Sequence, residues 1–495
     1  MLSAMQVLSK PRTQLATSRR VFMGTRRTPG PEHESDRVGS SVTTGLMKLQ
    51  SRIRDKVLAL DPSSQWHDLV SERKPKMSAA KEPPQQADVV IIGGGVMGWG
   101  VAYWLLSHFK GPSPMSVLVL EKDARVEMGA TARSVGGFRQ QFSRPENVQM
   151  SLYMAEFLRD AKKLLHVPGS TVDLGVRQGS YLFLADEDSA ATLEREFHMQ
   201  VAEGAKLDLL SPWQLSERFP WLNVDGVALG RLGLQNEGWF DPWSLHQAFR
   251  RKATYLGADF MHAEFKSFQM AKHKDSMDQV SGKRVSGVKV WIPGTACEYE
   301  VKCAVAVNAA GPWGGLVGKR AGLPFDHLPV ELRKRYVYSF HSNVSPVMDC
   351  PMLVNTDGTY VRPENFTGMY LCGRSPRHED EPPTDDLEVD HNYFTEEVWP
   401  SLGHRVPAFL DLKVKQSWAG FYDCNVIDGS PIIGYHHPLV PNLASICGFS
   451  GHGIQHCAAA SRGLAEMMLS GHFTTIDLSC FAPSDSRLVE EECLV

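Results

Sequence analysis

Cysteine is absent from the first half of the chain. All nine cysteines lie from Cys297 onward, and no two of them form a C-x-x-C pair. Nine cysteines in 495 residues are too few for a disulfide scaffold, and no Cys, His and Asp cluster has the spacing of a zinc site. We therefore expect reduced thiols, an intracellular compartment and no metal.

The chain also lacks an excess of charge of one sign. It has 52 Lys+Arg against 56 Asp+Glu, a formal net charge of −4, whereas a nucleic-acid binder normally shows a basic excess. The 22% of charged and 9% of aromatic residues are typical of a globular protein and exclude wholesale disorder and a coiled coil. At ~150 residues per domain, the length predicts two or three domains.

Acidic residues are missing from the N-terminus, where the first is Glu32. The segment before it is basic and rich in hydroxyl side chains, and contains Lys10, Arg12, Arg19, Arg20, Arg26 and Arg27. This composition is typical of a mitochondrial presequence, with an ordinary basic tail as the alternative. No apolar h-region suggests a secretory signal. Residues 1–87 therefore read as presequence and disordered linker, and the protein is expected in the mitochondrial matrix or at the matrix face of the inner membrane.

Charge is missing again from Val89 to Ser107, a run nearly long enough for a membrane-spanning helix. It contains five glycines, Gly93, Gly94, Gly95, Gly98 and Gly100. A strand, a glycine turn and the start of a helix explain this run better than a membrane span. We expect no span, while peripheral association with the inner membrane stays open.

The glycines form the pattern G-x-G-x-x-G directly after an apolar strand, 88–92. A helical pattern follows, and a second strand, 117–120, ends at Glu121. This is the order of a Rossmann unit: Gly93 allows the tight turn, Gly95 lets the backbone approach a pyrophosphate, and Gly98 permits close packing of helix on strand. Glu121 can accept hydrogen bonds from the ribose hydroxyls. The alternative is a tight strand–helix turn that binds nothing.

Four further segments follow in order: GATARSVGGFR at 129–139, NAAGPW at 308–313, WAG at 418–420 with DGSPIIG at 428–434, and GFSGHG at 448–453. Together with GGGVMG at 93–98, this order resembles the D-amino-acid oxidase / sarcosine oxidase / dimethylglycine dehydrogenase family of FAD enzymes. The resemblance spans residues 88 to about 470.

The resemblance implies an α/β fold in which a doubly wound, Rossmann-type FAD domain is interleaved with an antiparallel-sheet substrate domain. The FAD domain is expected in residues 88–144, 236–325 and 416–480, and the substrate domain in 145–235 and 326–415. Residues 481–495 are a C-terminal tail. The acidic stretch from Glu379 to Asp390 is expected to be a solvated loop.

FAD is the expected cofactor, bound noncovalently, because Arg133 stands where some family members attach the flavin through His, and Gly420 and Phe421 stand where others use Cys. The cofactor-binding residues that the motifs and the resemblance imply are Gly93, Gly95, Val96, Met97, Gly98, Glu121, Lys122, Thr131, Ala132, Arg133, Gly136, Gly137, Ala310, Gly311, Trp313, Gly420, Gly451, His452, Gly453 and Ile454.

In the family a substrate amine loses hydride to the flavin, and oxidases place a Lys over the flavin. Here Tyr370 is the counterpart of that Lys, which argues against fast dioxygen reduction. Tyr370 and His452 are the candidate catalytic residues. Arg139 and Arg362, with Tyr360, are candidates for binding a substrate carboxylate, since a guanidinium suits a bidentate contact. Surface pairing with a local acid is the alternative for each arginine.

Two functions follow from the resemblance. The first is a mitochondrial FAD flavoprotein that acts in assembly of respiratory complex I, with complex I subunits or assembly intermediates as partners. The rival is an active dehydrogenase of secondary amines or amino acids such as sarcosine or dimethylglycine. A NAD-linked oxidoreductase is a third alternative, against which the glycine turn at 448–453 argues.

Overall fold

The computed structural model describes residues 84–491, apart from 112, 124, 275–279, 296, 344–345, 347–349, 365–366 and 485–489. The expected presequence and most of the linker therefore lie outside the described residues.

The first large sheet carries the Rossmann unit. Its parallel strands, in spatial order, are β9 (Asp259–His262), β2 (Val117–Glu121), β1 (Gln86–Ile92), β12 (Glu298–Asn308) and β19 (Val440–Cys447). The antiparallel strands are β10 (Glu264–Lys274) and β11 (Val280–Trp291), which extend from β12, and β18 (Ile432–His436), which pairs with β19. β1 and β2 are apolar throughout their central residues because both faces of a parallel sheet are covered.

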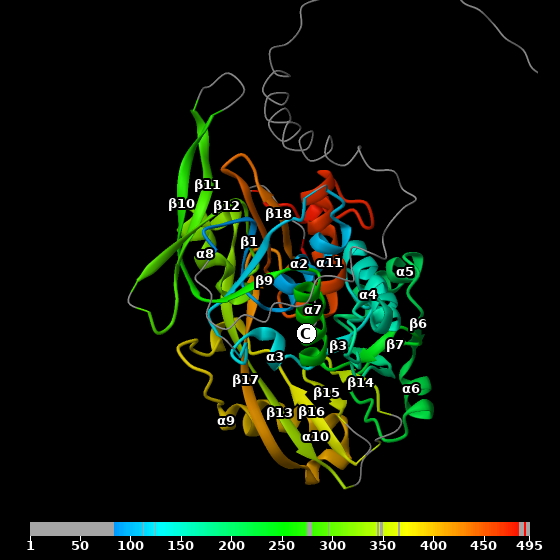
Figure 1. Cartoon of the computed structure of the whole chain (residues 1–495). Helices are drawn as coiled ribbons and strands as arrows, with labels where there is room; N and C mark the ends of the chain where they lie inside the picture. The colour runs from blue at the N-terminus through cyan, green and yellow to red at the C-terminus, as the bar shows by residue number, and fades with distance from the viewer. Residues whose placement is uncertain are drawn as a thin grey trace, which may run out of the picture.

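Four helices cover one face of this sheet (Figure 1): α2 (Val96–His108), α4 (Pro145–Leu164), α7 (Pro242–Tyr255) and α11 (Gly453–Ser470). α2 packs against both α7 and α11, and α11 also packs against α4. Trp99, Val101 and Leu105 of α2 are fully buried among these neighbours, which explains the uncharged run at 89–107. α8 (Gly314–Arg320) packs on the other face.

No helix in the described part of the chain has both the length and the apolar character needed to cross a membrane.

The second large sheet is almost entirely antiparallel and lies below the first in Figure 1. Its strands in spatial order are β17 (Lys413–Asn425), β13 (Val330–His341), β16 (Met369–Gly373), β15 (Tyr360–Pro363), β14 (Met352–Val354), β5 (Tyr181–Ala185), β7 (Leu229–Gly233) and β6 (Leu207–Leu210). One pair, β14 with β5, is parallel.

The remaining elements include a small sheet and further helices. A small sheet joins β3 (Gly137–Phe138), β8 (Glu237–Trp239) and β4 (Arg177–Gly179). The other helices are α3 (Ala130–Arg133), α5 (Ala190–Ala202), α6 (Pro212–Arg218), α9 (His391–Tyr393) and α10 (Trp399–Arg405).

The α/β class with a separate antiparallel sheet is confirmed, but two boundaries differ from those expected. Residues 145–164, assigned to the substrate half, form α4 and pack on α11 beside the Rossmann unit. Residues 416–425, assigned to the FAD domain, belong to β17 and pair with β13 in the second sheet. An amphipathic pattern shows that an element packs but does not show which neighbour it packs against.

Candidate functional site

The glycine turn after β1 has the geometry that its motif predicts. A Cβ atom on Gly93 would lie 2.2 Å from the Ala309 carbonyl oxygen, and its φ is +112°. A Cβ on Gly98 would lie 2.0 Å from the carbonyl oxygen of Gly93, so α2 can approach β1 only without a side chain there. Gly95 differs, because its Cβ would meet nothing closer than the Thr131 Oγ1 at 3.5 Å. The space beside Gly95 opens into the cavity described below.

The carboxylate of Glu121 is held at the end of β2. Its Oε2 accepts a hydrogen bond from the Gly94 backbone N–H (2.8 Å), and its Oε1 accepts one from the Asp123 backbone N–H (2.8 Å). Beside it, the Lys122 Nζ lies 3.5 Å from the centroid of the Trp313 indole ring. Burial lowers the pKa of Lys122, against the opposing effect of Glu121. These side chains form one end of the cavity and suit a ribose and its base.

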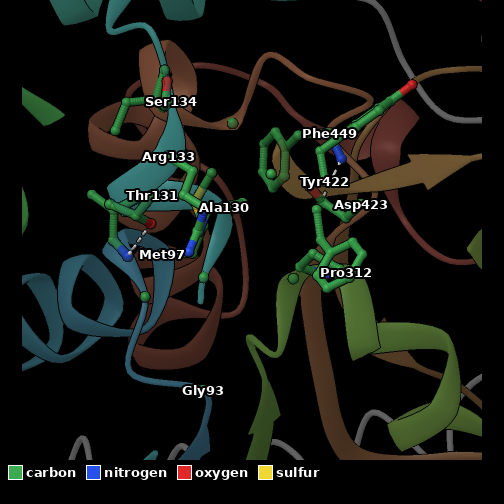
Figure 2. Close-up of a pocket in the computed structure, with 18 of the residues that line it drawn as sticks. Gly93, Met97, Ala130, Thr131, Arg133, Ser134, Pro312, Tyr422, Asp423 and Phe449 are labelled. Carbon is green, nitrogen blue, oxygen red and sulfur yellow. Dashed lines mark hydrogen bonds between the residues drawn. The ribbon is translucent and has the colours of Figure 1, made fainter. Parts of the chain in front are cut away.

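A cavity of about 390 Å³ runs from this end to the start of α11, between residues of both large sheets. Figure 2 shows Met97, Ala130, Thr131, Arg133 and Ser134 on one side of it and Pro312, Tyr422, Asp423 and Phe449 on the other. The expected site residues that line it are Gly93, Gly95, Val96, Met97, Glu121, Lys122, Thr131, Arg133, Gly137, Arg139, Ala310, Gly311, Trp313, Tyr360, Gly420, Gly451, His452, Gly453 and Ile454.

Five expected residues do not line this cavity: Gly98, Ala132, Gly136, Arg362 and Tyr370. Gly98 acts through packing, as described above. Gly136 has φ +70°, and a Cβ there would lie 2.1 Å from the Phe240 carbonyl oxygen, so this glycine shapes the loop.

Tyr370 does not line the cavity, and the expectation that it is a catalytic residue is corrected. The side chain is fully buried in the apolar core of the second sheet, where its ring stacks on Phe340 (centroids 5.2 Å apart) and meets Phe409 edge-on. Successive side chains of a strand point to opposite faces, so an alignment error of one residue exchanges the core face for the cavity face.

The expectation that Arg362 binds a substrate carboxylate is also corrected. Its guanidinium pairs with Glu364 (2.5 Å) and donates to the backbone carbonyl oxygens of Val135 (2.8 Å) and Pro363 (3.1 Å). These contacts join β15 to the loop that precedes β3, which is a structural role.

Arg139 and His452 meet in the cavity wall. Arg139 is 5% exposed, and its guanidinium lies over the rings of Phe142 (4.7 Å) and Phe183 (4.8 Å). Its Nη2 lies 3.2 Å from the His452 Nε2. Burial, together with the Arg139 charge, lowers the pKa of His452, so the ring is neutral at neutral pH and its Nε2 accepts from Arg139. His452 therefore positions Arg139.

The turn before α11 is held by Asp423 on β17. Its Oδ2 accepts from the backbone N–H groups of Gly448 (2.6 Å) and Phe449 (3.1 Å), and its carbonyl oxygen accepts from the Ser450 N–H (2.7 Å). Burial raises the pKa of the Asp423 carboxyl to about 6. The turn brings the N-terminus of α11 to the cavity wall, where unpaired N–H groups and the helix dipole favour negative charge.

Several lining residues escaped the sequence analysis, among them Tyr181, Arg335, Met352, Tyr422 and Asp423. Most lie on strands of the second sheet, and no motif marks them. The acidic stretch 379–390 is a mostly exposed loop, as expected, and two of its acids also attach it to β13: Glu381 pairs with Arg335 (2.7 Å) and Asp386 with Lys334 (3.1 Å). The basic run Arg333 to Arg335 was the one available signal, since it complements that acidic stretch.

Arg133, at the position where some family members attach the flavin through His, is held by backbone contacts. Arg133 donates to the backbone carbonyl oxygens of Glu127 (2.9 Å) and Ala419 (2.8 Å), which joins α3 to β17. A Cβ on Gly420 would lie 3.1 Å from the Arg133 Cβ. In the described part of the chain no cysteine lines the cavity, and its one lining histidine, His452, faces Arg139.

Comparison with known proteins places this geometry in context. Residues 88–467 match the family model described as DAO, FAD dependent oxidoreductase. The chain is 44% identical over 449 residues to the FAD-dependent oxidoreductase domain-containing protein 1 of Xenopus laevis, covering 88% of each chain. It is 25% identical over 437 residues to human mitochondrial dimethylglycine dehydrogenase, covering 82% of this chain and 45% of the relative.

A solved structure gives the same fold. The L-proline dehydrogenase from P. horikoshii matches with a TM-score of 0.67 and 26% identity, covering 81% of this chain and 98% of that chain.

Proposed function

This chain belongs to the family of FAD dependent oxidoreductases, and we propose that it oxidises the carbon–nitrogen bond of a small secondary amine or amino acid that carries a carboxylate. Its cofactor is FAD, and the residues present fit that group. Gly95 leaves the space that a pyrophosphate needs, and the Glu121 carboxylate is already oriented by two backbone N–H groups. Bound FAD supplies the hydride acceptor for such a reaction.

The position of Arg139 is the main support for this proposal. Its guanidinium is buried in the cavity wall, beside the start of α11, between two phenyl rings and the neutral His452. A buried cation favours a carboxylate strongly because water screens the pair little there. Tyr360 also lines this cavity and is the second candidate for substrate contact. Arg139 would hold the substrate, while the α11 N-terminus favours negative charge at the cavity wall.

Lysine placement supports an electron-transferring dehydrogenase over an oxidase. In the described part of the chain the one lysine that lines the cavity is Lys122, and it lies at the Glu121 end against Trp313. We therefore propose that electrons pass to a carrier and not directly to dioxygen.

An anaerobic screen tests this function. Holoprotein is mixed with sarcosine, dimethylglycine and proline, and flavin absorbance is followed. We expect at least one of these amines to bleach the flavin. Arg139→Ala should then lower the affinity for that substrate by roughly 10- to 150-fold, because a charge-assisted contact is lost. Arg159→Ala, at an exposed position of α4, is the matched control and should change nothing. A flavin that dithionite reduces but no amine bleaches would refute the proposal.

We also propose a place for this activity: the mitochondrial matrix, or the matrix face of the inner membrane, in assembly of respiratory complex I. The acid-free, basic segment before Glu32 supports the location. The resemblance described above supports the assembly role, with complex I subunits or assembly intermediates as partners.

Cells that lack the protein test the assembly role. Assembled complex I is measured on native gels after rescue with wild type, Gly95→Ala or Gly282→Ala. We expect wild type and Gly282→Ala to restore complex I, and Gly95→Ala to fail if bound FAD is required. Normal complex I in cells that lack the protein would end this proposal while leaving the amine screen to decide the enzymatic one.

A further inference from the structure

A second guanidinium lines the same cavity, on β13. The Arg335 Nη1 and Nη2 atoms lie 2.7 and 2.8 Å from the two oxygens of Glu381, a bidentate pair. Nη2 also donates to the Tyr422 Oη at 2.7 Å, and Tyr422 lines the cavity as well. The side chains of Arg335 and Glu381 are 20% and 17% exposed. The protein thus pairs one of its own carboxylates with a cation that lines the cavity.

The segment that supplies Glu381 is attached independently of this contact. It starts after Ser375, which also lines the cavity, and has no regular structure beyond a short turn at His378–Asp380. Asp386 pairs with the buried Lys334 (3.1 Å), and the Asp390 carbonyl oxygen accepts from the Tyr338 hydroxyl (2.7 Å). Release of Glu381 from Arg335 therefore leaves the segment held at these two points.

We propose that Arg335 and Tyr422 form a second anion subsite, that Glu381 fills this subsite when no ligand is bound, and that the substrate is an amino acid with a second acidic group. The inference rests on the proposed function, in which Arg139 binds the first carboxylate. A ligand carboxylate that replaces Glu381 keeps both charge-assisted hydrogen bonds to the guanidinium, so the exchange loses no pairing. A neutral group cannot make this exchange, because it would leave Arg335 unpaired in a partly buried wall.

Removal of Glu381 should have the opposite effect to removal of an ordinary contact residue. Because this side chain competes with the ligand, its removal should strengthen binding of a ligand with two carboxylates, whereas removal of an ordinary contact weakens binding. The gain should be largest for ligands that reach Arg335. The affinity for a ligand with one carboxylate, held at Arg139, should change less when Glu381 is removed.

Equilibrium binding of unreactive probes to the holoprotein tests this. Acetate is the probe with one carboxylate, and malonate, succinate and glutarate are probes with two, at increasing separation; binding is read from the perturbation of flavin absorbance. We expect one separation to bind more tightly than acetate. Glu381→Ala should strengthen binding of that probe by roughly two- to fivefold, the effect of freeing a partly exposed ion pair, and should change the binding of acetate less.

Three further variants make the assignment specific. Glu379→Gln removes the same charge from an exposed position two residues away and should change neither affinity. Arg335→Gln should abolish the advantage of two carboxylates while acetate binds as in wild type. If Arg335→Gln does not fold, Arg335→Lys keeps the charge but loses the bidentate geometry, and should reduce the advantage.

Equal affinity of all four probes, each dependent on Arg139, would overturn this inference and leave the proposed function standing. So would an advantage that Arg335→Lys does not reduce, or an unchanged affinity in Glu381→Ala. Failure of every probe to bind would overturn the inference and the carboxylate-binding role of Arg139 together.

Discussion

Substitution of Gly95 by alanine separates cofactor binding from folding. The added Cβ would lie no closer than 3.5 Å to any neighbour, and the backbone of Gly95 has φ −70°, which alanine adopts freely. The cost to the apoprotein is that of alanine at a helix N-cap, about 1 kcal/mol at most. The methyl group nevertheless enters the space that the pyrophosphate needs.

The expected loss of FAD affinity follows from the contacts that the methyl group prevents. A hydrogen bond from a backbone N–H to a charged oxygen contributes ~1.5–3 kcal/mol, so losing one lowers affinity by roughly 10- to 150-fold. Flavin content after purification and titration of the apoprotein with FAD measure this loss. Gly95→Val fills the same space further and should abolish binding.

Two further glycine-to-alanine variants serve as controls for Gly95→Ala. Gly98→Ala places a Cβ 2.0 Å from the Gly93 carbonyl oxygen, and this overlap should destabilise the apoprotein by about 1–3 kcal/mol or more. Gly282→Ala, on β11, meets nothing closer than 3.8 Å and should leave folding and FAD binding unchanged. Wild-type FAD affinity in Gly95→Ala would show that the pyrophosphate does not lie at Gly95, and the assignment of the cavity would fail.

Three other predictions concern the titration of Asp423, the attachment of the flavin and the role of Tyr370. Burial raises the pKa of Asp423 from 3.8 to about 6. Between these two pH values the folded state keeps a proton that the unfolded chain has already released. The free energy of unfolding therefore falls as the pH rises through this window, by on the order of 3 kcal/mol. Asp423→Asn removes this term, so its stability relative to wild type should rise between about pH 4 and about pH 6.5 in urea unfolding of the apoprotein; a constant difference would contradict it. Acid precipitation of holoprotein should leave the flavin in the supernatant, and flavin retained in the pellet would contradict noncovalent binding. Tyr370→Phe should change the rate of flavin reduction by less than roughly twofold once a substrate is known, because its ring lies in the core; a large fall in rate with unchanged stability would restore it as a catalytic residue.

The Rossmann unit could be predicted closely because its residues are neighbours along the chain. β1, the glycine turn, α2 and β2 follow one another without a break, and each glycine has a steric reason that the motif already expresses. The order of the later glycine segments likewise identified the turn before α11.

The substrate side of the cavity could not be predicted in the same way. Arg139 meets His452 across 313 residues of sequence, and Arg335 meets Tyr422 across 87. Neither distance along the chain carries information about contact. The error at Tyr370 has the same origin, since the choice between two faces of a strand depends on register.

By itself the sequence predicted a dinucleotide site and its place after β1, because a pyrophosphate imposes steric demands that only glycine at set positions meets. Only the tertiary structure decided which arginines face the cavity and which acid occupies one of them. Those side chains come from strands that pair over long separations, and their direction is set by sheet register and packing, which no local pattern encodes.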